Sequence, residues 1–138
     1  MINIREWFPL SQFSWWHYSA IEDGSSDDNF MWYLLEESKN VASGIDAVQI
    51  ATYTDDPNDE RNEDIDFWYL APNGDLSFYG YHEGGIGDER FPAQDVILTD
   101  PILFGQEDMT TGTVITDSGT GSIRVILPII GEVTRTIT

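Results

Sequence analysis

The stretch FWYLAPNGDLSFYGY, residues 67–81, decides the fold. Two runs of apolar and aromatic residues flank an Asn73-Gly74 pair, and Asn-Gly between such runs is the strongest short-range signal for a β-hairpin. Side chains of a strand point alternately to its two faces, so Phe67-Trp68-Tyr69-Leu70 carries large apolar groups on both. The sequence therefore predicts an antiparallel hairpin with two apolar faces.

Further strands are predicted on both sides of this hairpin. Residues 47–54 (AVQIATYT) are rich in β-branched and aromatic residues. Short apolar runs at 96–98 and 102–104 are separated by Asp100-Pro101. Residues 111–116 and 122–127 flank a Gly-containing turn, which predicts a second hairpin.

The run FMWYLL, residues 30–35, fits two structures. Its apolar spacing suits a helix within residues 28–43, whereas its three closely spaced aromatic residues favour a strand. With seven to nine strands joined by turn-rich loops, we expect a mostly β fold. Its antiparallel sheet or sheets form a sandwich or an open or half barrel, with at most one short helix, for which 28–43 is one candidate segment; for residues 30–35 we favour a strand.

Composition excludes several classes of protein. The 138 residues include 25 Asp and Glu but 6 Lys and Arg, a net charge of −19, so binding to nucleic acid through its phosphates is not expected. Cysteine is absent, which excludes disulfides and cysteine-based zinc sites. No apolar stretch approaches the roughly 18 residues of a membrane-spanning helix. The 5 Trp, 6 Tyr and 7 Phe argue for a packed core, in one domain over 1–138 or a piece of a longer β protein.

Several motifs together resemble a loose group of bacterial secreted or lipoprotein-like β proteins. That group opens with "YFPL, then W-x-Y", continues with a "YYL…GDLYYYG" hairpin, and then has a Pro- and Leu-rich stretch that ends in Gly. The similar residues here are 7–10 (WFPL), 15–18 (WWHY), 67–70 (FWYL), 74–80 (GDLSFYG) and 96–105. Residues 106–109 lack the Trp that the group usually carries there, and no export signal opens the sequence. The resemblance implies an all-β fold and an extracytoplasmic origin; the sequence as given reads as cytoplasmic.

The aromatic residues of the predicted strands are the main functional candidates. They exceed what one small core easily absorbs, so they line a ligand groove, form a subunit interface or enlarge the core. We expect a non-enzymatic binding or interaction module for a small apolar or sugar-like ligand or a protein partner. We also expect a homodimer, since apolar faces are readily buried against a second copy. The candidate residues are Trp32, Trp68, Tyr69, Phe78, Tyr79 and Tyr81.

The acidic residues suggest a second hypothesis. More than half of them lie within residues 20–66, so the chain is alternatively a polyanion mimic that binds a basic partner protein. The loop at 55–66 (DDPNDERNEDID) is a solvated loop or a weak divalent-cation site; no other cofactor is expected. EF-hand spacing fails, because Arg61 stands where Gly is required. The candidate ligands are Asp55, Asp56, Asp59 and Glu60.

A third hypothesis is a hydrolase or isomerase with a histidine and a carboxylate in one pocket. His82 and Glu83 are the candidate acid–base residues, with Asp75 as a second possible carboxylate. His82 is equally consistent with a structural ring at a strand end. The sequence has no cysteine and no G-x-S-x-G motif, so a non-enzymatic function is favoured.

Overall fold

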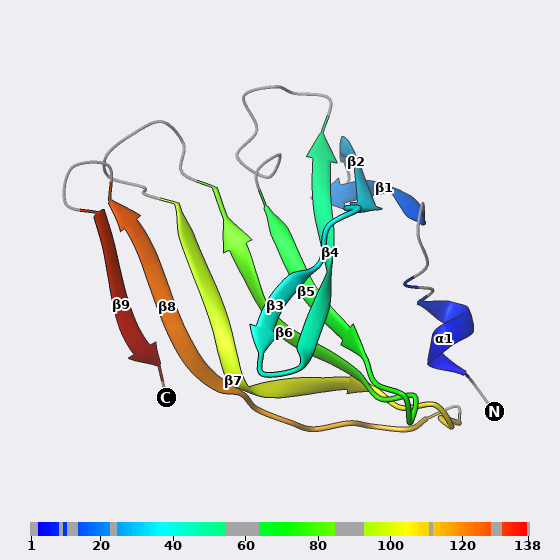
Figure 1. Ribbon diagram of the computed structural model, residues 1–138. Coiled ribbons are helices and arrows are strands. Elements are labelled where there is room, and N and C mark those ends of the chain that lie inside the picture. Colours follow the sequence, from blue (N-terminus) through cyan, green and yellow to red (C-terminus); the bar gives the residue numbers. More distant parts are fainter. Residues whose placement is uncertain are drawn as a thin grey trace.

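Nine strands and one short helix make up the described residues of the computed structural model (Figure 1). The described residues are 3–8, 10, 14–22, 25–54, 64–84, 93–110, 112–127 and 131–137. The elements are α1 (Ile4–Trp7), β1 (Trp15–Glu22), β2 (Ser25–Leu34), β3 (Lys39–Ala42), β4 (Ile45–Thr54), β5 (Ile65–Leu70), β6 (Leu76–Glu83), β7 (Gln94–Gly105), β8 (Thr120–Leu127) and β9 (Gly131–Ile137). No described helix is long and apolar enough to cross a membrane.

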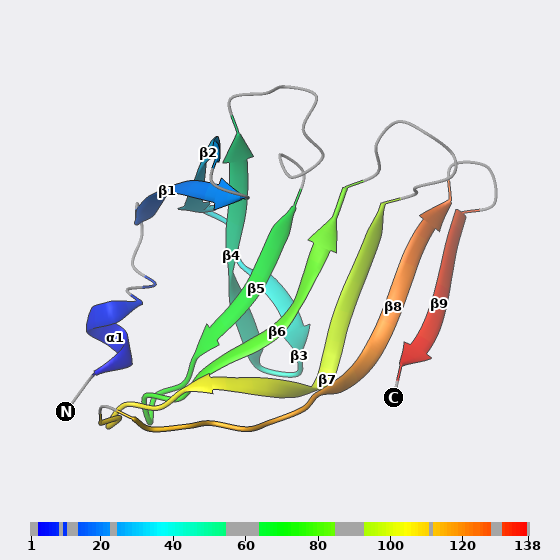
Figure 2. The ribbon, with the colours of Figure 1, turned by 180° about the vertical axis from the view of Figure 1, so that it is seen from behind.

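The strands form an open antiparallel sheet. Its order is β1-β2-β4-β5-β6-β7-β8-β9, and β3 pairs with β4 beside this path. The sheet is strongly curved, and its first and last strands lie at opposite sides of the molecule in both views (Figures 1 and 2). The prediction of a mostly β fold built on an open antiparallel sheet is confirmed.

The central hairpin, β5–β6, forms as its sequence predicts. The Ala71 N–H donates to the Asp75 carbonyl at 2.8 Å, and the Gly74 N–H donates to the Ala71 carbonyl at 2.9 Å. Asn73 Oδ1 accepts from the Asp75 N–H at 3.1 Å, the local bond that makes Asn a turn former. Gly74 has a φ of +92°, a conformation that other residues rarely adopt.

The position of the helix and the second hairpin are corrections to the sequence analysis. Residues 28–43 contain no helix, because β2 pairs with both β1 and β4 and β3 pairs with β4. The prediction of a second hairpin from residues 111–116 and 122–127 was wrong, because residues 112–119 form no strand and β8 pairs with β7 and β9. The Asp117 carboxylate accepts from the Leu103 N–H at 2.8 Å, so this segment lies along β7 rather than turning back.

Strand β7 also joins two apolar runs that the sequence separates. It is continuous through Asp100 and Pro101, with a register irregularity between Leu98 and Asp100. Proline has no N–H to donate to the ladder, so within a sheet it is tolerated at such irregularities, where the regular bonding is already interrupted. The two runs therefore belong to a single long strand.

The β3–β4 hairpin divides the sheet into two unlike faces. Strand β3 crosses in front of β5 and β6 in Figure 1 and behind them in Figure 2. Lys39 of β3 reaches Asp95 of β7 and the ring of Phe67 of β5, so these side chains share the face that β3 crosses. We name it the covered face. Trp68, the next residue of β5, points to the opposite face, which we name the aromatic face.

The helix α1 is attached at the lower end of the β5–β6 hairpin. The Arg5 guanidinium donates to the carbonyls of Ala71 and Pro72 at 3.3 and 3.0 Å. Ile4 is buried against the backbone of Gly105, where a Cβ would lie 2.9 Å from its side chain. These contacts hold the end of the helix, and with it Phe8, beside the aromatic face.

Candidate functional site

Five aromatic rings form a continuous cluster on the aromatic face. Trp68 lies at its centre, with ring centroids 5.3 Å from Phe8, 5.1 Å from Phe78 and 5.1 Å from Phe104. Phe8 in turn stacks on Trp16 at 5.4 Å with 15° between the ring planes. Strands β1, β5, β6 and β7 and the end of α1 each contribute one ring. We call these five residues the aromatic cluster.

The aromatic cluster is a surface rather than a closed core. Phe104 is 55% exposed, and Phe8, Trp16, Trp68 and Phe78 are half-buried. Aromatic rings in offset or edge-to-face contact stabilise each other by about 0.5–1.5 kcal/mol beyond their burial, which holds the cluster in shape. A preformed apolar surface of this kind suits a ligand or a partner.

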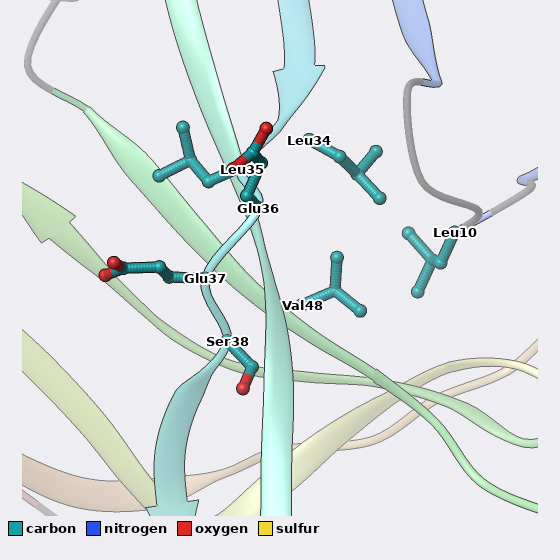
Figure 3. Close-up of a pocket in the computed structure, with 7 residues that line it drawn as sticks. All are labelled: Leu10, Leu34, Leu35, Glu36, Glu37, Ser38 and Val48. Carbon is teal, nitrogen blue, oxygen red and sulfur yellow. The ribbon is translucent and has the colours of Figure 1, made fainter.

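An apolar hollow adjoins the aromatic cluster. It has a volume of about 170 Å³ and is open to solvent. Leu10, Leu34 and Val48 point into a common space between β4 and the segment that carries Leu10 (Figure 3). Val48 is the register partner of Trp68, so the hollow and the cluster meet across β4 and β5. The complete lining is Leu10, Leu34, Leu35, Glu36, Glu37, Ser38 and Val48.

The acidic rim of the hollow is fixed to the sheet. The Leu35 N–H donates to the Gln49 carbonyl at 2.9 Å, and Gln49 Nε2 donates to the Glu37 carbonyl at 2.9 Å. One residue of β4 therefore holds both ends of the connection between β2 and β3. Glu36 and Glu37 are exposed, and their backbone positions are set by these two bonds.

The covered face holds a different constellation, centred on a buried carboxylate. The Asp95 side chain is 4% exposed, and its Oδ1 lies 2.5 Å from Nδ1 of His82. Lys39 Nζ lies 3.7 Å from Asp95 Oδ2 and 5.7 Å from the centroid of the Phe67 ring. A buried carboxylate requires such partners, and Lys39 and His82 supply them.

The predicted acid–base residues His82 and Glu83 point to opposite faces. They are neighbours in β6, and Glu83 accepts a hydrogen bond from Gln94 Nε2 while His82 contacts Asp95. The alternative carboxylate, Asp75, bonds to Asn73 within the hairpin turn. Sequence reasoning missed Asp95, whose only signal is its polarity at the start of a long apolar strand.

The six aromatic candidates divide between the two faces. Trp68 and Phe78 meet in the aromatic cluster, whereas Tyr69 and Tyr79 meet on the covered face at 6.1 Å, edge to face. Burial, followed by the nearby Tyr69, raises the pKa of Tyr79. Trp32 is the register partner of Trp16 and is half-buried. Sequence reasoning missed Phe8, Trp16 and Phe104, which lie in apolar runs that resemble ordinary core.

A second, half-buried carboxylate lies on the aromatic face. Asp66 pairs in register with Tyr81, and burial together with the neighbouring charge of Asp64 raises its pKa to about 6. The pKa of Tyr81 is raised by burial and by the charges of Glu83 and Asp64. Negative charge therefore accumulates beyond the aromatic cluster, toward the end of β6.

The predicted cation ligands Asp55, Asp56, Asp59 and Glu60 lie outside the described residues. Among the described side chains, no group of three or more His, Asp or Glu is placed to hold a metal ion.

The comparisons with known proteins add no relative. No family model, curated protein or solved structure matches the chain.

Proposed function

We propose that this chain is a non-enzymatic binding protein that holds a small apolar ligand on the aromatic cluster and in the adjoining hollow. The observation that carries the proposal is the position of Trp68. It contacts three other aromatic rings, yet the cluster remains half-exposed and continues into an apolar hollow. A ring that served only the core would be covered by the chain itself.

The dimensions of the site set the expected affinity. A ligand that buries about 200 Å² of apolar surface gains about 5 kcal/mol at 25 cal/mol per Å². Part of that gain is lost because the ligand gives up its translational and rotational freedom. We therefore expect dissociation constants on the order of 1 mM for a single small molecule.

Titration with an uncharged fluorophore tests the proposal. N-phenyl-1-naphthylamine is apolar and brightens in dry surroundings, and it is not repelled by a chain of net charge −19. Trp68→Ala is expected to weaken its binding about tenfold, the effect of losing about 1.4 kcal/mol of contact. Tyr69→Ala is the matched control, because it removes the neighbouring ring of β5 from the other face. Equal binding by both variants, or no binding to the wild-type chain, refutes the proposal.

A second copy of the chain is the competing occupant of the aromatic cluster. The expected homodimer is tested by light scattering on the 15.6 kDa chain with and without Trp68→Ala. A dimer that this substitution dissociates would assign the cluster to a subunit interface and remove the ligand proposal. A monomer, or a dimer that the substitution leaves intact, keeps the cluster available to a ligand.

A further inference from the structure

The hollow combines an apolar interior with a rim of one charge sign. Leu10, Leu34 and Val48 supply its aliphatic side chains, and Glu36 carries the carboxylate beside them, whereas the side chains of Leu35 and Glu37 extend away from this space (Figure 3). From this combination we infer that the ligand is a cationic amphiphile, an amine or ammonium attached to one apolar group of about the size of a single ring. This inference rests on the proposed function and specifies its ligand.

The volume of the hollow sets the size of the apolar group. An apolar cavity of about 150 Å³ in a protein is large enough to hold benzene. The hollow, at about 170 Å³, therefore accommodates one six-membered ring or a branched aliphatic chain of similar size. Any larger apolar part of the ligand extends over Trp68, which pairs in register with Val48 of the hollow.

The charge of the ligand follows from the placement of the rim. Gln49 fixes the backbone on both sides of Glu36, so the residue that carries the carboxylate is held at the rim before a ligand binds. Two of the chain's cations have described side chains, and both are engaged elsewhere. Arg5 binds the Ala71 and Pro72 carbonyls, and Lys39 turns to Asp95 on the covered face.

The aromatic cluster also favours a cationic ligand. The face of a Trp ring carries partial negative charge and attracts a cation within about 6 Å of its centroid. Trp68 pairs in register with Val48, so the aromatic cluster borders the hollow across β5 while Glu36 belongs to its rim. An anionic ligand is repelled by both, and a neutral ligand gains apolar contact but no attraction between charges.

Three ligands that share one ring test the inference. Benzyltrimethylammonium, benzyl alcohol and benzoate are titrated as competitors of N-phenyl-1-naphthylamine on the wild-type chain. We expect the cation to bind about fivefold more tightly than the alcohol, a difference of about 1 kcal/mol, and benzoate to bind most weakly. Raising the salt concentration from 0.05 to 0.5 M should shrink the advantage of the cation and leave the alcohol unchanged.

Charge-matched variants locate the effect. Glu36→Gln combined with Glu37→Gln should bring the cation to within about twofold of the alcohol. Asp46→Asn combined with Asp100→Asn changes the net charge equally at exposed positions outside the lining and should preserve the preference. If both pairs abolish the preference, the overall charge causes it and the inference is wrong. If the cation and the alcohol bind wild type equally, the inference is wrong while the proposed function stands. If the fluorophore itself does not bind, both fail.

Discussion

The two faces of the sheet differ in how far their aromatic rings are buried and in which groups lie beside their carboxylates. On the covered face, Phe67 is only 1% exposed and the buried carboxylate of Asp95 lies beside two cationic or protonatable side chains. On the aromatic face, Phe104 is 55% exposed and the half-buried carboxylate of Asp66 lies near that of Asp64. The chain supplies the partners of the covered face, whereas the aromatic face keeps apolar surface and negative charge available to a molecule outside the chain.

This difference between the faces distinguishes residues that stabilise the fold from residues that are available for binding. Residues whose partners all come from one chain contribute to folding, and their substitution is expected to change the free energy of unfolding. Residues that remain half-exposed in a preformed cluster contribute less to folding and more to binding. Stability measurements on matched pairs of residues from the two faces can therefore refute or refine the assignment of function to the aromatic face.

The largest expected difference is between two phenylalanines. Phe67→Ala empties a fully buried position and should lower the free energy of unfolding by about 3–5 kcal/mol. Phe104→Ala removes a ring that is mostly in solvent and should lower it by about 1 kcal/mol. Urea denaturation followed by circular dichroism measures both. Equal losses would mean that the aromatic cluster is part of the core.

The ion pair between Lys39 and Asp95 should contribute about 1–2 kcal/mol to folding. Lys39→Met removes a cation from the buried carboxylate, and the lysine is partly exposed, so the loss stays below that of a fully buried pair. A double-mutant cycle with Asp95→Asn measures the coupling between the two side chains. Additive effects would show that β3 covers the sheet without help from this pair.

The contribution of Asp66 to the free energy of unfolding should change with pH in the opposite direction from that of a carboxylate in an ion pair. Its pKa of about 6 in the folded protein exceeds the ordinary 3.8, so the folded state binds the proton more tightly. Its contribution to stability is therefore fully present below about pH 4 and is lost as the pH rises through 6. Asp66→Asn should stabilise the chain at pH 7.5 by about 1–2 kcal/mol, reduced from the full linkage value by residual solvent contact, with no gain at pH 4.

Urea midpoints at several pH values test that expectation. The difference between Asp66→Asn and wild type should increase between pH 4 and 6 and then level off. A difference that is constant with pH would mean that Asp66 is no more buried in the folded chain than in the unfolded one.

The smallest effect is expected at the exposed pair that accompanies α1. Arg5 Nε lies 3.8 Å from Glu107 Oε1, and both side chains are about half in solvent. Glu107→Gln should change the free energy of unfolding by less than about 0.5 kcal/mol, and added salt should remove even that. A loss as large as that of Lys39→Met would contradict the distinction between covered and exposed pairs.

Local chemistry explains what the sequence predicted correctly. The hairpin between Leu70 and Leu76 depends on turn residues that are adjacent in the chain, so it could be recognised without the rest of the fold. The number of strands could be predicted for the same reason. The grouping of side chains could not, because the contact of His82 with Asp95 depends on the pairing of β6 with β7.

The division of the aromatic residues shows the same limit. Alternation along β5 predicts that Trp68 and Tyr69 face opposite sides, but not which side the chain itself covers. That outcome depends on the β3–β4 hairpin, whose Lys39 contacts residues far along the sequence. The predicted candidates therefore included rings from both faces, and only those on the uncovered face gained a proposed role.

The order of the strands also has a consequence for how the chain folds. Apart from β3, each strand pairs with the strands that precede and follow it in sequence. Adding a strand then closes one short loop at a time, which keeps the entropy loss of each step small. Once the β5–β6 hairpin has formed, the sheet can grow outward in both directions, and the β1–β2 and β8–β9 hairpins can join it as preformed pairs.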